Sequence, residues 1–142
     1  MKRATGMFWL IVAFGLCVPP VVAIGIEVVK GTPLASASGQ WIEHLFQPGY
    51  NEFLLTLFTA TPFIVLAVFS IFHLTSENTS KRLTGVAGAL AVGAGLMIWG
   101  LVAIRMSHGS TAAIGFVFLP FEVAIVMPIG YCAGRLLRRL VT

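Results

Sequence analysis

Four apolar segments, each about 20 residues long or longer, constrain the fold of this chain more than any other feature of its sequence. A helix needs about 20 apolar residues to cross the hydrocarbon core of a bilayer. In lipid, backbone groups can be satisfied only within a helix or a closed barrel, and the alternating segments of a barrel are absent. The sequence therefore predicts four transmembrane helices, at about residues 7–29, 53–74, 85–104 and 112–133.

The composition agrees with this interpretation and excludes a soluble domain. Hydrophobic residues make up 58% of the 142 positions and charged residues only 10%, whereas soluble domains carry about 25% charged residues. The net charge is +4, but the basic residues form small clusters between the apolar segments, so no nucleic-acid binding is expected. We predict one all-α domain over residues 1–142, a four-helix bundle in the membrane.

The distribution of basic residues predicts the orientation. Seven of the nine Lys and Arg residues fall on one side of the predicted spans, namely Lys2, Arg3, Lys81, Arg82, Arg135, Arg138 and Arg139. Lys30 and Arg105 fall on the other side. The positive-inside rule then places both termini in the cytoplasm. The short basic segment before the first helix favours a bacterial inner membrane, and its apolar run is too long for a cleaved signal peptide.

Residues 30–52 form the one long predicted connection, on the outer side of the membrane. Its first part is rich in Gly, Ser, Ala and Pro, so we expect it to be irregular. In its second part, Trp41 and Leu45 share one face at i, i+4 spacing, with Ile42 and Phe46 beside them. This pattern predicts a short helix, lying in the membrane interface, over about residues 41–46.

Small residues predict how the third span packs. Gly85, Ala89 and Gly93 recur every four residues, and Gly95 belongs to a second small face beside them with residues 87 and 91. Small residues at this spacing let helix backbones approach closely, which drives association where lipid removes the hydrophobic effect between helices. We expect one face to pack within the bundle and the second to meet another helix, another subunit or a partner protein.

Prolines interrupt three of the four predicted spans, at Pro19 and Pro20, at Pro62, and at Pro120 and Pro128. Each removes a backbone N–H and frees a carbonyl one turn earlier, which predicts a kink. Such breaks near the midplane mark binding sites in some transporters and are tolerated kinks in ordinary bundles. We favour the second interpretation.

The two cysteines do not predict a disulfide. Cys17 falls near mid-membrane and Cys132 near the cytoplasmic end of the fourth span, whereas a disulfide needs Cα atoms within about 7 Å. We expect both to be small core residues.

Glu122 is the residue most suggestive of function. It lies about ten residues from either end of its predicted span, or roughly 15 Å from each surface at 1.5 Å per residue. A carboxylate at that depth is costly, so we expect Glu122 to face the bundle interior. Lys and Arg are absent from the middle of all four spans. We therefore predict an intramembrane polar site of Glu122 with Thr59 and Thr61.

Three functions are compatible with such a carboxyl group: a hydrogen-bonded tie between helices, a carrier of protons or cations, and a lining residue of an oligomeric ion path. We favour the first, in a small non-enzymatic membrane protein that acts as an accessory or assembly subunit or as an immunity-type inhibitor. The alternative is a small proton-coupled transporter or channel that uses Glu122.

Catalytic residues and a cofactor are not expected, because no second acid or histidine falls at the depth of Glu122. A metal site is not expected either, because Glu43, His44, Glu52 and His108 on the outer side match no metal-binding spacing. The expected partners are other membrane subunits or further copies of the chain, together with membrane lipids. The lipid headgroups would be contacted by Arg135, Arg138 and Arg139.

The orientation can be tested with a fusion after Thr142. We expect a reporter that is active only outside the cytoplasm to be inactive there, and a cytoplasmic reporter to be active. The same pair of reporters placed between residues 31 and 40 should give the opposite pattern. Activity of the external reporter after Thr142 would contradict the predicted orientation.

Overall fold

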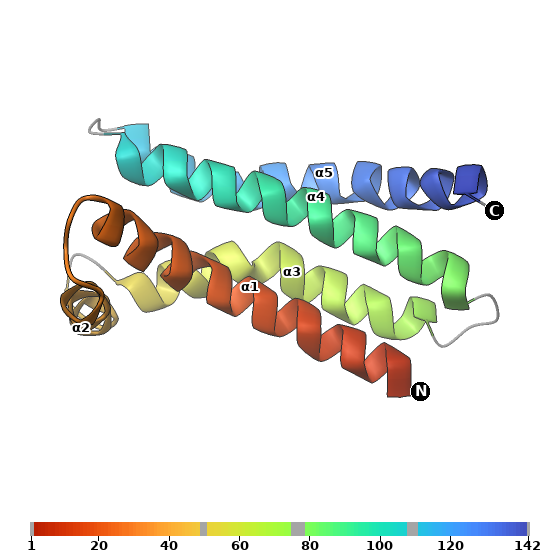
Figure 1. The fold of residues 1–142 in the computed structure, drawn as a ribbon, viewed down its shortest axis with the longest axis horizontal. Helices are drawn as coiled ribbons and strands as arrows, with labels where there is room; N and C mark the ends of the chain where they lie inside the picture. Colours follow the sequence, from red (N-terminus) through yellow and green to blue (C-terminus); the bar gives the residue numbers. More distant parts are fainter. Residues whose placement is uncertain (1, 49–50, 75–78, 108–110, 142) are drawn as a thin grey trace.

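The structure is a computed structural model that describes residues 2–48, 51–74, 79–107 and 111–141. These residues form five helices: α1 (Lys2–Val29), α2 (Leu34–His44), α3 (Glu52–Leu74), α4 (Thr79–Met106) and α5 (Thr111–Val141). The four long helices run side by side with alternating direction, and the short α2 lies across one end of them (Figure 1). We call this the α2 end.

The start of α1, the end of α3, the start of α4 and the end of α5 lie at the opposite end (Figure 1). We call it the basic end, since Arg82 near the start of α4 and Arg135, Arg138 and Arg139 in the last turns of α5 lie there. The structure thus gathers at one end the residues that the positive-inside rule assigns to one side of a membrane.

All four long helices are long and apolar enough to cross a membrane, over Ala4–Val29, Glu52–Leu74, Arg82–Met106 and Ile114–Leu140. At most 39% of the most apolar window of each helix is buried inside the protein, so most of its side chains are at least partly exposed. Outward-facing apolar side chains include Trp9, Val21, Phe72 and Ile125. The prediction of an all-α chain with four apolar spans is confirmed at this level.

Three helices extend well beyond their predicted bounds, and the first of them, α1, begins at Lys2 rather than near residue 7. α4 begins at Thr79 rather than near residue 85, and α5 continues past residue 133 to Val141. With 31 residues, α5 is about 46 Å long, which exceeds the roughly 30 Å hydrocarbon core. α5 is therefore longer than the apolar layer, and its arginines lie toward its C-terminal end.

The expectation that the first part of this connection is irregular is confirmed for residues 30–33 and is wrong for residues 34–40, which are helical. α2 begins at Leu34, and Pro33 precedes it as the N-cap residue. Proline has a fixed φ, which favours a helix start, and the alanines that follow are strong helix formers. The Ala37 amide donates to the Pro33 carbonyl, and the Ala37 side chain is buried. Helix propensity and this contact outweigh the loop-like composition of the segment.

Gly31 ends α1 and turns the chain toward α2. Its φ is +100°, a left-handed conformation that glycine adopts without strain. The Gly31 amide donates to Val28 O and the Thr32 amide to Glu27 O, the two hydrogen bonds of a Schellman motif. An ion pair between Lys30 and Glu27, 2.9 Å long, lies beside this turn.

The closest helix contact joins α4 and α5 through glycines. A Cβ atom added to Gly88 would lie 2.3 Å from the Gly130 carbonyl oxygen and 3.0 Å from the Gly134 Cα. Gly85 and Gly93 also face α5, against Tyr131 and Met127. The absence of side chains at these positions lets the two backbones touch, which gives dispersion contacts that lipid cannot replace.

The remaining helices pack on this α4–α5 pair around one apolar core. α1 packs mainly on α3, where Phe63 fills the space beside Gly15 and is fully buried. The core continues into α4 and α5 through Ala89, Met97 and Val123. The core therefore runs along the bundle between the α1–α3 and α4–α5 pairs.

The prolines that predict kinks all lie inside helices that continue on both sides of them. They are Pro19 and Pro20 of α1, Pro62 of α3, and Pro120 and Pro128 of α5.

Cys17 and Cys132 are free and exposed on the helix surfaces, so the expectation that they are core residues is wrong. In a membrane, lipid can cover a small apolar thiol as well as a protein core does.

The α4–α5 contact predicts an asymmetric effect of alanine along α4. Gly88→Ala should destabilise the protein by about 1–3 kcal/mol, because the new methyl group meets backbone atoms that cannot yield. Gly95→Ala is the matched control, because a Cβ at Gly95 meets nothing within 4 Å. Unfolding of the purified variants in mixed micelles would measure the difference, and equal stability of the two would contradict this packing.

Candidate functional site

Glu122 lies on the outer surface of α5 and is exposed. The expectation that it faces the bundle interior is wrong for the single chain. α5 uses the face with Val123 and Gly130 to contact α4, and a neighbouring face with Met127 and Tyr131 is turned toward α3. Because successive residues are 100° apart around a helix, Glu122 projects away from both neighbours.

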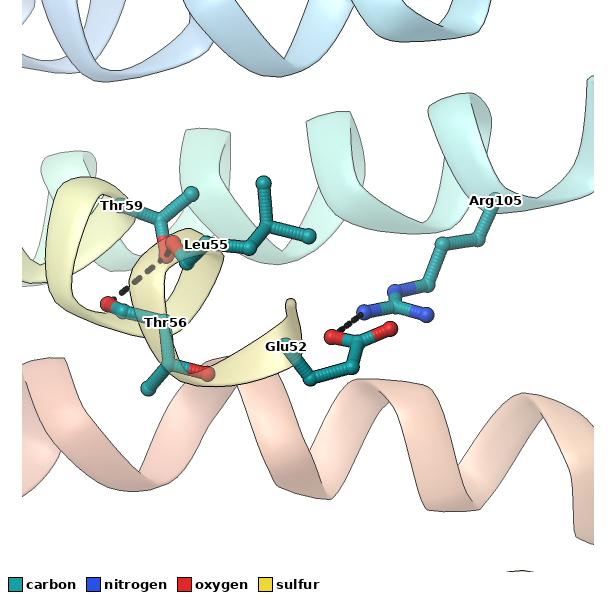
Figure 2. Close-up of polar contacts among 5 residues, drawn as sticks. All are labelled: Glu52, Leu55, Thr56, Thr59 and Arg105. Atoms are coloured by element: carbon teal, nitrogen blue, oxygen red, sulfur yellow. Dashed lines mark hydrogen bonds and ion pairs between the residues drawn. The ribbon is translucent and has the colours of Figure 1, made fainter. Parts of the chain in front are cut away.

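Glu122, Thr59 and Thr61 are not joined by hydrogen bonds. Thr59 is fully buried, and its hydroxyl donates to the carbonyls of its own helix, at 2.8 Å from Leu55 O and 3.1 Å from Thr56 O (Figure 2). The Thr61 hydroxyl is exposed and donates to Leu57 O at 3.3 Å. Within the described residues, Glu122 has no hydrogen bond or ion pair.

The level of Glu122 in the bundle follows from its neighbours on α5. Leu119 packs on Gly100 of α4, and Val123 approaches Gly93. Glu122 therefore lies level with the part of α4 between those glycines. Arg105 is five residues beyond Gly100, at least about 7 Å further along the axis. The carboxyl group is thus set into the apolar part of the bundle, away from the charged groups at both ends.

A face of small residues on α4 lies on the same side of the α4–α5 pair as Glu122. Residues 87, 91 and 95 are exposed, and Gly95 has open space where its Cβ would be. Val92 packs on Gly130 yet is 39% exposed, which marks it as the edge of the α4–α5 contact on this side. We call this surface the outer α4–α5 face; it comprises residues 87, 91 and 95 of α4 and Glu122, Ile129 and Ala133 of α5.

At the α2 end, Glu52 and Arg105 form a largely buried ion pair, with 2.6 Å between Glu52 Oε2 and Arg105 Nη2 (Figure 2). Their side chains are only 11% and 19% exposed, respectively. The Arg105 guanidinium also lies over the ring of Phe116 on α5, 5.6 Å from its centroid. Arg105 thereby connects α4 to α3 through an ion pair and to α5 through a cation–π contact.

A second polar cluster holds α3 at the basic end. His73 Nε2 and the Tyr131 hydroxyl share a hydrogen bond, and the His73 ring stacks on Phe69 at 4.8 Å. Arg82 donates from Nη1 to the His73 carbonyl at 3.0 Å. Arg135 lies over the Tyr131 ring at 5.8 Å from its centroid. His73 thus joins α3 to α5 through Tyr131.

The sequence could have indicated both clusters. Glu52 starts α3 and Arg105 lies in the last turn of the antiparallel α4, both at the α2 end. His73 lies in the last turn of α3, and Tyr131 lies toward the same end of the parallel α5. The charge pattern at the helix ends predicts orientation, but it does not by itself pair residues across helices. Among the described residues, no three His, Cys, Asp or Glu side chains gather to form a metal-binding group.

The Glu52–Arg105 pair predicts strong coupling between two substitutions. Glu52→Gln or Arg105→Gln alone should cost about 2–3 kcal/mol, somewhat less than for a fully buried pair, because each leaves an unpaired charge. The double variant should lose clearly less than the sum of the two. As a control, Glu27→Gln removes the exposed Lys30–Glu27 pair and should cost less than about 1 kcal/mol. Additive losses in the double variant would show that the pair is not coupled.

Comparison with known proteins does not assign the chain to a family. The chain matches no protein-family model, and no curated protein or solved structure is significantly similar to it. Any function must therefore be argued from the residues and geometry of the chain itself.

Proposed function

We propose that this chain is a non-enzymatic subunit of a larger membrane assembly and that a helix of a partner protein covers its outer α4–α5 face. The observation that carries the proposal is the exposed Glu122, which has no polar partner among the described residues and lies in the apolar part of α5. A carboxyl group that faces lipid at this level costs several kcal/mol. A polar group on a partner helix would remove that cost.

The shape of the outer α4–α5 face supports the same proposal. Exposed residues 87, 91 and 95 form a small-residue surface that lets another backbone approach α4 closely. Ile129 beside Glu122 on α5 is 64% exposed and supplies apolar contact area. Close packing and one hydrogen-bonding carboxyl group together are the features by which helices recognise one another in lipid.

In this proposal the protein is an accessory or assembly subunit, or an inhibitor of the immunity type, in a bacterial inner membrane with both termini in the cytoplasm. Arg135, Arg138 and Arg139 at the end of α5 anchor the basic end among anionic headgroups. The competing function, transport of protons or cations through Glu122, needs the same carboxyl group to bind and release charge rather than to hold a partner.

The proposal predicts different effects of two changes at Glu122. A photocrosslinking residue at Ile129 should label one specific partner in cells, and the same residue at Val21 of α1, which is 66% exposed, should not. Glu122→Leu should lower the yield at Ile129 about tenfold, since a lost buried hydrogen bond costs about 1–3 kcal/mol. Glu122→Gln should keep most of the yield, because an amide both donates and accepts.

Native mass measurement of the tagged chain supplies the second readout. A partner of different sequence in a fixed ratio, identical to the crosslinked species, is expected. A homo-oligomer alone would contradict the subunit proposal. Intact assembly with complete loss of an associated ion flux in Glu122→Gln would favour the transport function instead.

A further inference from the structure

An apolar groove of about 480 Å³ lies between α3 and α5, on a different side of α5 from Glu122. Ala89 of α4 forms part of its floor. Aromatic pairs between the two helices mark its ends: Phe58 with Phe121 at 6.3 Å, and Phe69 with Tyr131 at 6.2 Å between ring centroids. The groove does not involve the outer α4–α5 face, so the inference drawn from it is independent of the proposed function.

Three of the helix prolines, Pro62, Pro120 and Pro128, line this groove. Proline inside a helix removes a backbone hydrogen bond and bends the helix axis. The Arg105 contacts hold α3, α4 and α5 together at the α2 end, and the His73–Tyr131 hydrogen bond holds α3 to α5 at the basic end. The helices are thus joined at both ends and kept apart between them, which makes the groove a built feature of the bundle.

The chemistry of the lining selects an apolar occupant. Thr61 and Tyr131 carry the only hydroxyl groups among the lining residues. The Thr61 hydroxyl donates to Leu57 O, and the Tyr131 hydroxyl is hydrogen-bonded to His73. Both are therefore satisfied within the protein, and the remaining surface offers dispersion contacts to hydrocarbon.

The length of the groove matches one leaflet of a bilayer. From Phe121 to Tyr131 is ten residues, or about 15 Å along α5. This is half the roughly 30 Å hydrocarbon core, the depth of one leaflet. A single hydrocarbon chain of that length can lie against the apolar lining.

Positive charge lies where the groove reaches the basic end. Arg135, one turn beyond Tyr131, covers its ring, and Arg82 uses one guanidinium nitrogen on the His73 carbonyl. A guanidinium group has five N–H donors in a planar fork that suits phosphate oxygens. Among the described residues, no acidic side chain lies at this end: Glu27, Glu43 and Glu52 belong to the α2 end.

We propose that this groove binds one anionic phospholipid of the leaflet at the basic end. One acyl chain lies in the groove between Phe121 and Tyr131, and the phosphate accepts hydrogen bonds from Arg135 and Arg82. A groove as long as one leaflet is deep and a phosphate site at the membrane surface together define a specific lipid site. Such a site differs from the general attraction of a basic surface for anionic membranes.

The test uses the purified full-length chain in neutral detergent, with phosphatidylglycerol and phosphatidylcholine of identical acyl chains. Native mass measurement should show one phosphatidylglycerol per chain, bound at least tenfold more tightly than phosphatidylcholine. Ala124→Phe, which fills the groove, should abolish this binding, whereas Ile129→Phe on the outer α4–α5 face should not change it. Glu122→Leu should also leave it unchanged, which separates this inference from the proposed function.

Two matched variants of α5 test the headgroup contact. Arg135→Gln should weaken phosphatidylglycerol binding about tenfold, and Arg139→Gln, which removes the same charge one turn further out, should weaken it less than threefold. Equal effects of the two would reduce the interaction to general charge attraction and overturn the proposal. Equal binding of the two lipids would overturn it as well.

A measurement on the chain without substitutions does not depend on whether the variants fold. Phosphatidylglycerol with a photoreactive group in its acyl chain should label α3 and α5 at Val65, Phe69 and Ala124, and not the exposed Val21 on α1. Uniform labelling of all helices would contradict a specific site. Loss of a homodimer in Ala124→Phe, with lipid binding unchanged, would assign the groove to a second copy of the chain instead.

Discussion

The close approach of the α4 and α5 backbones is the contact on which the other features of this bundle depend. Inside a bilayer the hydrophobic effect does not distinguish a helix neighbour from a lipid tail, so association relies on dispersion and polar contacts. Gly88 between Gly130 and Gly134 supplies one of the closest of these contacts. It also fixes how α5 is rotated, and thereby which of its residues face α3, which face α4, and which face away from both.

The polar groups of this chain are placed in two different ways. Toward the ends of the bundle, Arg105 of α4 pairs with Glu52 of α3 and lies over Phe116 of α5. Tyr131 of α5 is hydrogen-bonded to His73 of α3. In the apolar part, Glu122 is exposed and Thr59 and Thr61 bond to their own backbone. The polar groups near the helix ends are thus paired within the chain, whereas the one carboxyl group in the apolar part is exposed and has no polar partner among the described residues.

Sequence patterns predicted the four spans correctly because apolar length is a local property that needs no knowledge of neighbours. The same patterns failed at α2, where a loop-like composition hid a run of good helix formers after Pro33. They also placed Glu122 within the apolar part of its helix, but they did not give its direction. Position along a helix follows from counting residues, whereas direction depends on which face of α5 meets α4.

The packing face of α4 shows the same limit. The four-residue repeat of Gly85, Ala89 and Gly93 identified the correct side of the helix, yet Gly88, outside that repeat, makes one of the closest backbone contacts. Its partners, Gly130 and Gly134, are also four residues apart on α5. Reading the two helices together would have paired these glycines, whereas reading each helix alone could not.

The paired glycines also fix the register of α4 and α5. A slide of one helical turn would bring the side chain of Val126 or of Arg138 into the space that Gly130 and Gly134 leave open beside Gly88. The pair therefore responds to a thinner or thicker bilayer by tilting as a unit, because its helices cannot shift past each other. Glu122 and Arg135, about 20 Å apart along α5, keep that spacing in every membrane, so bilayer thickness sets how far each lies from the surface.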